Sequence, residues 1–579
     1  MKKKPIPKTI GDSHVKSVQQ ALLQSLNSLS INNYPQTTKE TVTFIQGLYP
    51  NIGSVTSKFD DPHPDRTNDL TLYLKDGSIT YINLFYIKKG GKIQPKNLGA
   101  KSFLTKYFLS QDMQDIFNNK FEKYYLEFLK DLVEHNEGTH YITDKKELKT
   151  LVQDYFPKFT NDINEYRGRF LFNLRETCFS LLQQFHNQGN IGLGFSHAFN
   201  SFFMVDNVNI ITQYGKDEND IQVEKFCPSY PTFKDIELYK IGKASVGIKF
   251  GEVALTLRFK FESDPTTSIK LATSYHEFPE EQDIKNINKK TINKIKKLIT
   301  KHEYIKIKNN SNAIGKCHEA FSYYYFLKEF PNIVQVDPNT CIELLGTYYS
   351  ALKPETLKEL FDSTSTIVPA ITKKLRQKYN DYTIESIELI PDAYIGDRLD
   401  TGDLQLILKA NNDIIVENIS LKALSKKNSK ITTKNPGIGT ILGPTYFNVG
   451  SMESIVNEVK STFNTGGLNH RDSLEKLSYE LGKQLEKANQ EQLRTGTGNL
   501  LGKAMMAITI YNEGVSLCKE HSEINSAIKV KINTPTTIQN TILWSNDQET
   551  ISLRMKFSKG QHHGWSSVKL TSEYQLNIK

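Results

Sequence analysis

The chain reads NDLTLYLKDGSITYINLFYIKKGGKIQPKNLG at residues 68–99 and returns to a weakly similar stretch, GDLQLILKANNDIIVENISLKALSKKNSKITTKNPG, at residues 402–437. In each stretch apolar and polar residues alternate in two successive runs, which predicts two neighbouring β-strands. Asp69 precedes Lys88 by nineteen residues, and Asp403 precedes Lys422 by the same nineteen. This recurrence indicates an internal repeat.

Shorter blocks match in the same order in both halves of the chain. IGDSH (Ile10–His14) resembles IGKCH (Ile314–His318) near the start of each half. The ends of the halves agree best, and there LTLRFKF and TSIKLATSY (residues 255–261 and 267–275) match ISLRMKF and SSVKLTSEY (residues 551–557 and 566–574). We therefore expect two tandem copies of one fold.

Length and composition limit the class of protein. A chain of 579 residues with 38% hydrophobic residues suits two to four domains. No apolar stretch approaches 18 residues, so neither a transmembrane helix nor a membrane partner is expected. Five scattered cysteines without CxxC spacing predict a reducing cytoplasm and no structural zinc site. A net charge of +9 permits a polyanionic partner without requiring one.

The order of predicted elements is similar in both copies and indicates a mixed α/β (α+β) fold. A helix comes first, then a pair of strands, then helices, and a β-rich segment closes each copy. The expected helices are 13–29, 111–133, 316–330, 474–488 and 500–511, and the expected strands are 70–74, 79–88, 404–408 and 414–421. The predicted domains are copy 1 at residues 1–275, a basic linker helix at 276–312, and copy 2 at 313–579. The linker reads either as a solvated connector or as a contact to the DNA backbone.

Copy 2 places three reactive residues where one site could form. Glu319 lies on the first helix, Asp403 begins a strand, and Lys422 ends the next strand. Carboxylate oxygens bind hard cations such as Mg²⁺, and a metal-activated water beside a lysine can hydrolyse a phosphodiester bond. The sequence therefore predicts a Mg²⁺-dependent nuclease site.

The fragments GKCHEAF, GDLQL and ISLKA resemble the PD-(D/E)XK nuclease superfamily, which includes most type II restriction endonucleases. The resemblance implies that Glu319 and Asp403 are metal ligands and that Lys422 is the catalytic lysine. It also implies double-stranded DNA as the partner and Mg²⁺ as the cofactor.

One departure from the pattern of that superfamily concerns the acid two residues before the lysine, where this chain has Ser420. Glu319 could supply the missing carboxylate. Glu417 is a further candidate metal ligand, although strand alternation places it on the face opposite Ser420 and Lys422. Asp397 and Asp400 read as loop residues.

Copy 1 keeps Asp69 and Lys88, but Val15 stands where copy 2 has Glu319. Tyr86 aligns with Ser420, and Asn83 with Glu417. Valine cannot bind a metal ion, so copy 1 is expected to be a degenerate, inactive site. The alternative is that copy 1 was never a nuclease and Asp69 is a turn residue.

The closing strands alternate basic and apolar side chains, which would gather cations on one face of a sheet. The expected DNA-binding residues are Arg554, Lys556, Lys569, Arg258, Lys260 and Lys270. His562 and His563 lie in a glycine-bounded turn between two strands.

These features together favour a sequence-specific, Mg²⁺-dependent DNA endonuclease of a restriction system. It would act as a single-chain pseudo-dimer, either as a monomer or as a homodimer on DNA. The alternatives are a non-catalytic nucleic-acid-binding scaffold and an RNA or DNA-repair nuclease of the same superfamily.

Overall fold

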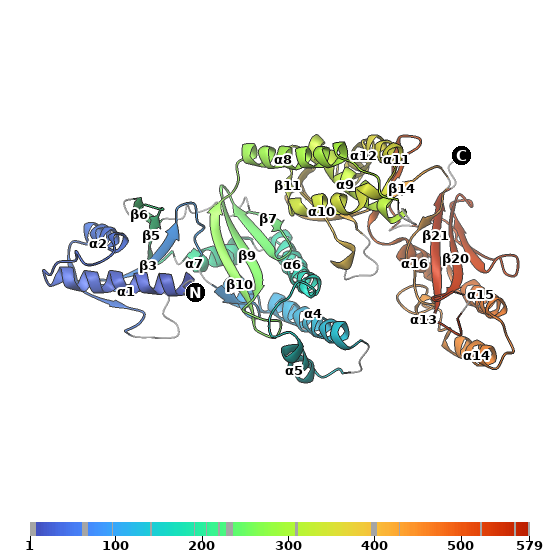
Figure 1. The fold of residues 1–579 in the computed structure, drawn as a ribbon, viewed down its shortest axis with the longest axis horizontal. Coiled ribbons are helices and arrows are strands. Elements are labelled where there is room, and N and C mark those ends of the chain that lie inside the picture. The colour runs from blue at the N-terminus through green and yellow to red at the C-terminus, as the bar shows by residue number, and fades with distance from the viewer. Residues whose placement is uncertain are drawn as a thin grey trace. The chain divides into compact units, whose positions relative to one another are not determined.

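A computed structural model gives the fold (Figure 1). The residues that it describes are 7–60, 68–94, 97–138, 142–189, 191–203, 205–217, 220–226, 236–306, 311–394, 402–427, 429–521, 524–560 and 563–576. Asp397, Asp400 and His562 lie outside these ranges. The chain divides into two compact units, Met1–Phe278 and Pro279–Lys579.

The first unit begins with a five-stranded mixed sheet, here called sheet A, in the order β1-β2-β3-β5-β6. Neighbouring strands are antiparallel except β3 and β5, which are parallel. The strands are β1 (Ile52–Ser57), β2 (Leu70–Leu74), β3 (Ile79–Lys88), β5 (Val208–Tyr214) and β6 (Ile221–Phe226). Helices α1 (Pro7–Leu26) and α2 (Gln36–Leu48) pack on it, and Val18, Leu70 and Ile82 share one buried core.

The rest of the first unit is an antiparallel sheet with a set of helices. Sheet B has the order β4-β10-β9-β8-β7. Its strands are β4 (Asn97–Gly99), β7 (Ile236–Ile241), β8 (Ser245–Phe250), β9 (Val253–Phe261) and β10 (Ile269–Glu277). The helices are α3 (Phe103–Phe108), α4 (Gln111–Glu137), α5 (Lys145–Tyr155), α6 (Asn164–Asn187), η1 (Ile191–Phe195) and α7 (Ser196–Phe203). Phe117 of α4 stacks on Phe259 of β9, so aromatic packing joins the helices to the sheet.

The second unit contains a six-stranded mixed sheet, sheet C, in the order β11-β12-β13-β14-β16-β17. Its strands are β11 (Val334–Gln335), β12 (Thr383–Leu389), β13 (Leu404–Ala410), β14 (Asp413–Leu424), β16 (Met505–Ile510) and β17 (Val515–Lys519). The helices beside it are α8 (Glu281–Thr300), α9 (Ser311–Glu329), α10 (Pro338–Tyr348), η2 (Tyr349–Ala351), α11 (Pro354–Thr364), α12 (Ile367–Tyr379) and η3 (Asp392–Tyr394). Leu404 and Leu406 face this helical layer and share a core with Phe321 of α9.

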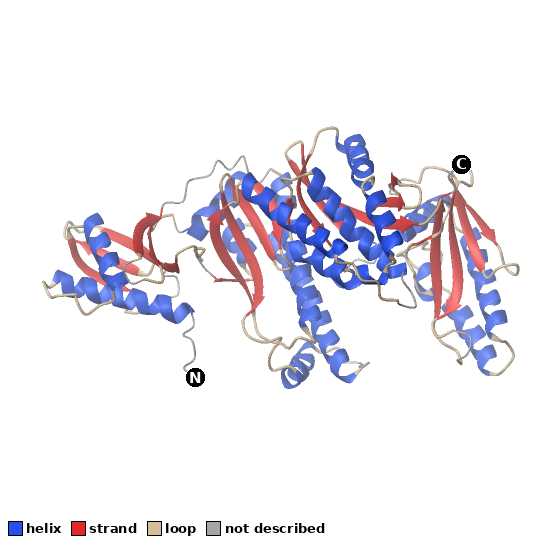
Figure 2. Cartoon of the chain, turned by 45° about the horizontal axis from the view of Figure 1, so that its top comes forward, coloured by secondary structure: helices blue, strands red, loops and turns tan. Residues whose placement is uncertain are grey.

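An antiparallel sheet closes the second unit (Figure 2). Sheet D has the order β15-β21-β20-β19-β18. Its strands are β15 (Ile431–Thr432), β18 (Lys529–Ile532), β19 (Gln539–Trp544), β20 (Glu549–Phe557) and β21 (Val568–Leu576). The helices are α13 (Ile438–Ile441), α14 (Glu453–Asn464), α15 (His470–Glu486) and α16 (Gln490–Leu501), of which α15 packs against β18, β19 and β20.

Sheets A and C follow one pattern of pairing. In both sheets two antiparallel pairs precede one parallel pair and one antiparallel pair, with β11 as an extra edge strand in sheet C. Sheets B and D also share one strand order, in which the last strand of the unit lies second. The predicted mixed α+β class is confirmed.

Two expected elements differ from the structure. The helix predicted at residues 500–511 is the end of α16 followed by the strand β16. Because β16 is central and covered on both faces, all six residues of MMAITI are buried, and such a run does not display a strand's alternation. The expected linker helix is α8, whose Ile295 is fully buried in the core of the second unit. Asn288 of α8 also donates hydrogen bonds to the carbonyl oxygens of Pro331 and Ile333, so α8 is part of that unit.

A two-residue turn sets the register of the β13–β14 hairpin. Asn411 and Asn412 both have positive φ angles, 51° and 70°, and Ala410 pairs with Asp413 across the turn. Asparagine tolerates this left-handed backbone, and such a turn matches the natural twist of a hairpin.

Within the described ranges, no helix combines the length and the apolar character that crossing a membrane requires.

The contact between α15 and sheet D gives a test of the fold. A Cβ atom on Gly482 would lie 2.4 Å from Oδ1 of Asn540 and 2.6 Å from Cγ1 of Ile532. We expect Gly482→Ala to lower the free energy of unfolding by about 1–3 kcal/mol through overpacking. Gly346→Ala in α10 is the matched control, because a Cβ atom there meets nothing within 4 Å. It should raise stability by up to about 1 kcal/mol through helix propensity. Urea denaturation measures both, and equal effects would contradict the packing.

Candidate active site

Asp403 is held at the start of β13 by the neighbouring strand. Its backbone N–H bonds to the carbonyl of Ile419, and its Oδ2 accepts a 2.7 Å hydrogen bond from the backbone N–H of Leu421. Ser420 Oγ lies 3.4 Å from the same oxygen. Oδ1 of Asp403 accepts no hydrogen bond from any described residue. The carboxylate is therefore fixed in orientation while one of its oxygens stays open.

Lys422 lies on β14 two residues beyond Ser420. Its Nζ is 3.6 Å from Oδ2 of Asp403, and its side chain is 26% exposed. In the part of the chain that the structure describes, this ammonium makes no hydrogen bond. Its three donors are therefore available to a water molecule or to an anionic substrate.

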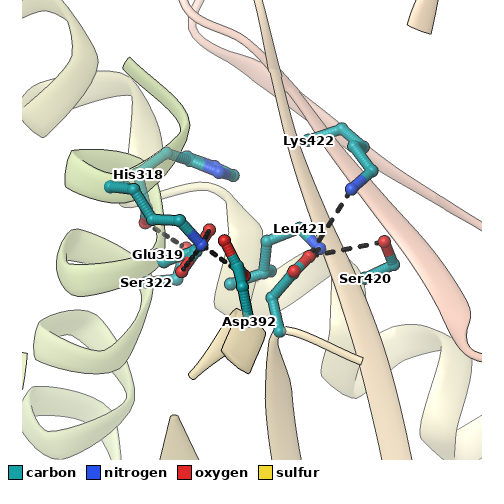
Figure 3. Close-up of polar contacts among 9 residues, drawn as sticks. His318, Glu319, Ser322, Asp392, Ser420, Leu421 and Lys422 are labelled. Carbon is teal, nitrogen blue, oxygen red and sulfur yellow. Dashed lines mark hydrogen bonds and ion pairs between the residues drawn. The ribbon is translucent and has the colours of Figure 1, made fainter. Parts of the chain in front are cut away.

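Glu319 lies on α9 and is paired with a lysine of the same helix. Lys316 Nζ donates to both carboxylate oxygens of Glu319, at 2.8 and 3.1 Å, and to Oδ1 of Asp392 at 2.7 Å. Asp392 belongs to the short helix η3 that follows β12, and its side chain is 63% exposed. Figure 3 shows Glu319 and Asp392 beside each other, across from Ser420 and Lys422 on β14.

Burial and charge shift the titration of this cluster. Burial raises the pKa of the Glu319 carboxyl to about 8, Asp403 adds to the rise, and Lys316 opposes it. Burial acts against the charged form of Lys316, but Glu319 and Asp392 outweigh it and raise the pKa of Lys316. Perturbed groups in contact with one another are typical of functional sites.

His318 borders the site as a neutral group. Burial lowers its pKa to about 3, and the charge of Lys422 acts in the same direction. Its Nε2 lies 2.9 Å from Thr509 Oγ1 of the neighbouring strand β16. The histidine therefore helps to position α9 on sheet C.

The structure does not bring Glu417, the further metal ligand expected from the sequence, to Asp403. Glu417 accepts hydrogen bonds from Lys378 and Tyr379 of α12. The alternation of β14 explains this, since Glu417 lies on the face of that strand opposite Ser420 and Lys422.

The donor set fits one hard cation. Among the described residues, no group of three or more His, Cys, Asp and Glu side chains converges on a metal position. Mg²⁺ is often held by only one or two carboxylates, with water and substrate phosphate as its other ligands. Asp403 has an open oxygen, and Glu319 is close enough for the charge of Asp403 to raise its pKa. These two residues could hold Mg²⁺.

The first unit has different residues at the positions that correspond to the site of the second unit. Leu70 lies opposite Ile82 and Leu404 opposite Ile419, so Asp69 corresponds to Asp403. Ile82 and Ile419 therefore occupy equivalent positions, and the residues that follow them are Asn83 and Ser420. Asn83, rather than Tyr86, corresponds to Ser420. Val15 of α1 is buried in the core, as expected for an apolar side chain.

The equal spacing from aspartate to lysine does not reflect equal positions. Counting along β3 from Asn83 places Phe85 at the position of Lys422, while Lys88 lies three residues further on and pairs with Tyr214. The lengths of the two hairpins cause the difference. β2 and β3 pair over three residues fewer on each strand than β13 and β14, and their longer turn restores only half of that length, so the first hairpin is three residues shorter. Asp69 instead contacts Lys58, whose Nζ lies 3.0 Å from Oδ1.

The expected DNA-binding residues lie on β9 and β10 of sheet B and on β20 and β21 of sheet D, and in each sheet they are here called the basic row. Arg554, Lys556 and Lys569 are exposed, and Lys556 lies directly opposite Lys569. In the first unit Arg258 is exposed, and Lys260 lies directly opposite Lys270.

Three charged residues of these sites were not identified from the sequence. Lys316 lies inside the GKCHEAF fragment, so its spacing of three residues from Glu319 on a helix was an available signal. Asp392 and Lys58 each come shortly after a strand, and no local pattern marks their partners.

Comparison with known proteins gives one extensive similarity. The chain is 69% identical over 572 residues to the type II restriction enzyme BsuRI of Bacillus subtilis, covering 99% of each chain. No family model matches the chain.

The raised pKa of Glu319 predicts a pH-dependent stability. The value in an unfolded chain is about 4.5, so the contribution of the protonated carboxyl is fully present below that pH and is lost as the pH rises through about 8. Without divalent cations, we expect the free energy of unfolding of the wild type to fall relative to that of Glu319→Gln over this window. Urea denaturation of both proteins at a series of pH values measures the difference, and a constant difference would contradict the prediction.

Proposed function

Since the chain belongs to the type II restriction enzymes and is an endonuclease, we propose that its second unit carries the active centre of a sequence-specific, Mg²⁺-dependent DNA cleavage reaction. The observation that carries this proposal is the pairing of a fixed carboxylate with a lysine that makes no hydrogen bond among the described residues. Asp403 has one open oxygen, and Lys422 Nζ lies 3.6 Å from the other.

Asp403 and Glu319 would hold the cation. Bound there, Mg²⁺ would activate a water molecule and offset charge that develops on the phosphate. Glu319 must lose its proton to act as a ligand, and cation binding favours that loss.

Lys422 would act on the attacking water and on the phosphate. Its ammonium can orient the water, take part in its deprotonation, and stabilise negative charge in the transition state. The rigid attachment of Lys422 and Asp403 to paired strands limits their motion, which favours catalysis by positioning.

We propose further that the two units are tandem PD-(D/E)XK-like copies, divided near residues 275 and 313. The common strand orders of sheets A and C and of sheets B and D support a duplication. The first copy, with Val15 and Phe85 at two key positions, would be inactive. The chain would then act as a pseudo-dimer in which only one half cuts.

The basic rows of sheets B and D are proposed to bind the DNA backbone. Directly opposed like charges weaken a sheet, yet Lys556 faces Lys569 and Lys260 faces Lys270. A phosphate between the two lysines of a pair would remove the repulsion. Arg554 and Arg258 would extend these rows.

A cytoplasmic location agrees with the cysteines. Those that the structure describes are free thiols, and Cys178, Cys317 and Cys341 are buried. Reduced thiols are typical of the cytoplasm.

Cleavage of supercoiled plasmid tests the proposed active centre. With Mg²⁺ the wild type should give open circles, because a single active half nicks one strand. We expect Asp403→Asn and Lys422→Ala to lower the cleavage rate by at least about 100-fold while DNA binding persists, since each removes a group that acts on the reacting atoms.

Lys88→Ala is the matched control, because Lys88 lies away from Asp69 on a first unit that is proposed to be inactive. It should cleave like the wild type. Linear product from the wild type at the earliest times would instead indicate two active halves or a cleaving dimer. Unimpaired cleavage by Lys422→Ala would overturn the assignment of the active centre.

The salt dependence of DNA binding tests the basic row of sheet D. If Lys569 contacts a phosphate, Lys569→Ala should reduce the slope of log Kobs against log salt concentration by about 0.9. Lys487→Ala, at the C-cap of α15, the helix that packs on the other face of this sheet, should leave the slope unchanged. Fluorescence anisotropy with a DNA duplex measures both, and equal slopes for wild type and Lys569→Ala would remove Lys569 from the interface.

A further inference from the structure

Each unit places a lysine ammonium inside its carboxylate cluster. In the first unit Lys58 Nζ lies 2.8 Å from Oδ1 of Asp12 and 3.0 Å from Oδ1 of Asp69. In the second unit Lys316 Nζ bridges Glu319 and Asp392. A cation of the protein itself therefore occupies part of both sites.

The two aspartates that immediately precede β2 and β13 are held in the same way. The backbone N–H of Leu84 donates to Oδ2 of Asp69 at 2.9 Å, as the N–H of Leu421 donates to Oδ2 of Asp403 at 2.7 Å. Their other oxygens differ. Oδ1 of Asp69 binds Lys58, whereas Oδ1 of Asp403 is not bonded to any described residue. Lys58 thus takes the oxygen that the second unit leaves open for a metal ion.

The second unit leaves room for one cation rather than two. Both oxygens of Glu319 and one of Asp392 already accept from Lys316. Oδ2 of Asp403 accepts from Leu421, which leaves Oδ1 of Asp403, the second oxygen of Asp392 and the remaining lone pairs of Glu319 as metal donors. A second divalent ion would have to displace an ammonium that burial makes costly to leave unpaired.

We propose that lysine ammonium groups replace divalent cations at two places in this chain. Lys58 takes the metal position of the first unit, and Lys316 takes the place of a second metal ion in the second unit. The chain then binds a single divalent cation, on Asp403 and Glu319. This inference rests on the proposed function and specifies its metal stoichiometry.

Titration of the full chain with Mn²⁺, followed by the electron paramagnetic resonance signal of the free ion, counts the sites without measuring activity. The wild type should bind one Mn²⁺ per chain, in competition with Mg²⁺, and Asp403→Asn should bind none. Lys58→Met removes the ammonium and keeps the length of the side chain. It should raise the count to two, because Asp12 and Asp69 are then free.

The double variant Lys58→Met/Asp403→Asn should return the count to one, now in the first unit. Circular dichroism checks that each variant is folded, and Lys58→Gln serves as a second substitution if Lys58→Met is not. A folded Lys58 variant that still binds one ion overturns the role of Lys58.

The number of Mn²⁺ ions bound per wild-type chain tests the claim that the second unit holds one cation. A plasmid-cleavage assay on the same preparation separates this inference from the proposed function. Two ions on a wild type that cleaves with Mg²⁺ overturn this inference and leave the proposed function standing. No bound ion, together with cleavage that does not depend on Mg²⁺, overturns both.

Discussion

One backbone-to-side-chain hydrogen bond organises the proposed active centre, the bond from Leu421 N–H to Oδ2 of Asp403. It joins the residue before one strand to the next strand, so the carboxylate cannot turn without breaking this bond and leaving the N–H of Leu421 without its acceptor. The bond occupies one oxygen and directs the other outward, and it places Lys422 one residue further along β14. The same bond occurs between Leu84 and Asp69 in the first unit, where the open oxygen meets Lys58. The two aspartates are thus held by the same hydrogen bond and differ in the group that lies beside their second oxygen.

The sequence predicted the elements with clear periodicity and missed those without it. Strands β2 and β3 have their predicted bounds. The fully buried β16 has no alternation to detect, so its sequence predicts a helix instead of a strand. At the site, the sequence predicts Glu319, Asp403 and Lys422. It does not predict Asp392 and Lys58, because an ion pair between distant segments leaves no local pattern, whereas Lys316 lies only three residues from Glu319 on the same helix.

Spacing misled where hairpins of different length were compared. The equal interval from Asp69 to Lys88 and from Asp403 to Lys422 suggests equal roles, but the first hairpin is three residues shorter, because its strands pair over fewer residues and its longer turn makes up only part of that loss. Register across a hairpin depends on loop length as well as on strand length. A count along the chain predicts equivalent positions only when both hairpins have the same total length.

The position of Phe85 also bears on how the asymmetry of the chain persists over evolutionary time. Under the proposed duplication, restoring a second active centre would require both the loss of Lys58, which would free Asp12 and Asp69 for a cation, and a lysine in place of Phe85. Either change alone would leave that centre incomplete, because the cation and the lysine would act together. No single substitution would then restore two working halves, so the proposed division of labour would persist.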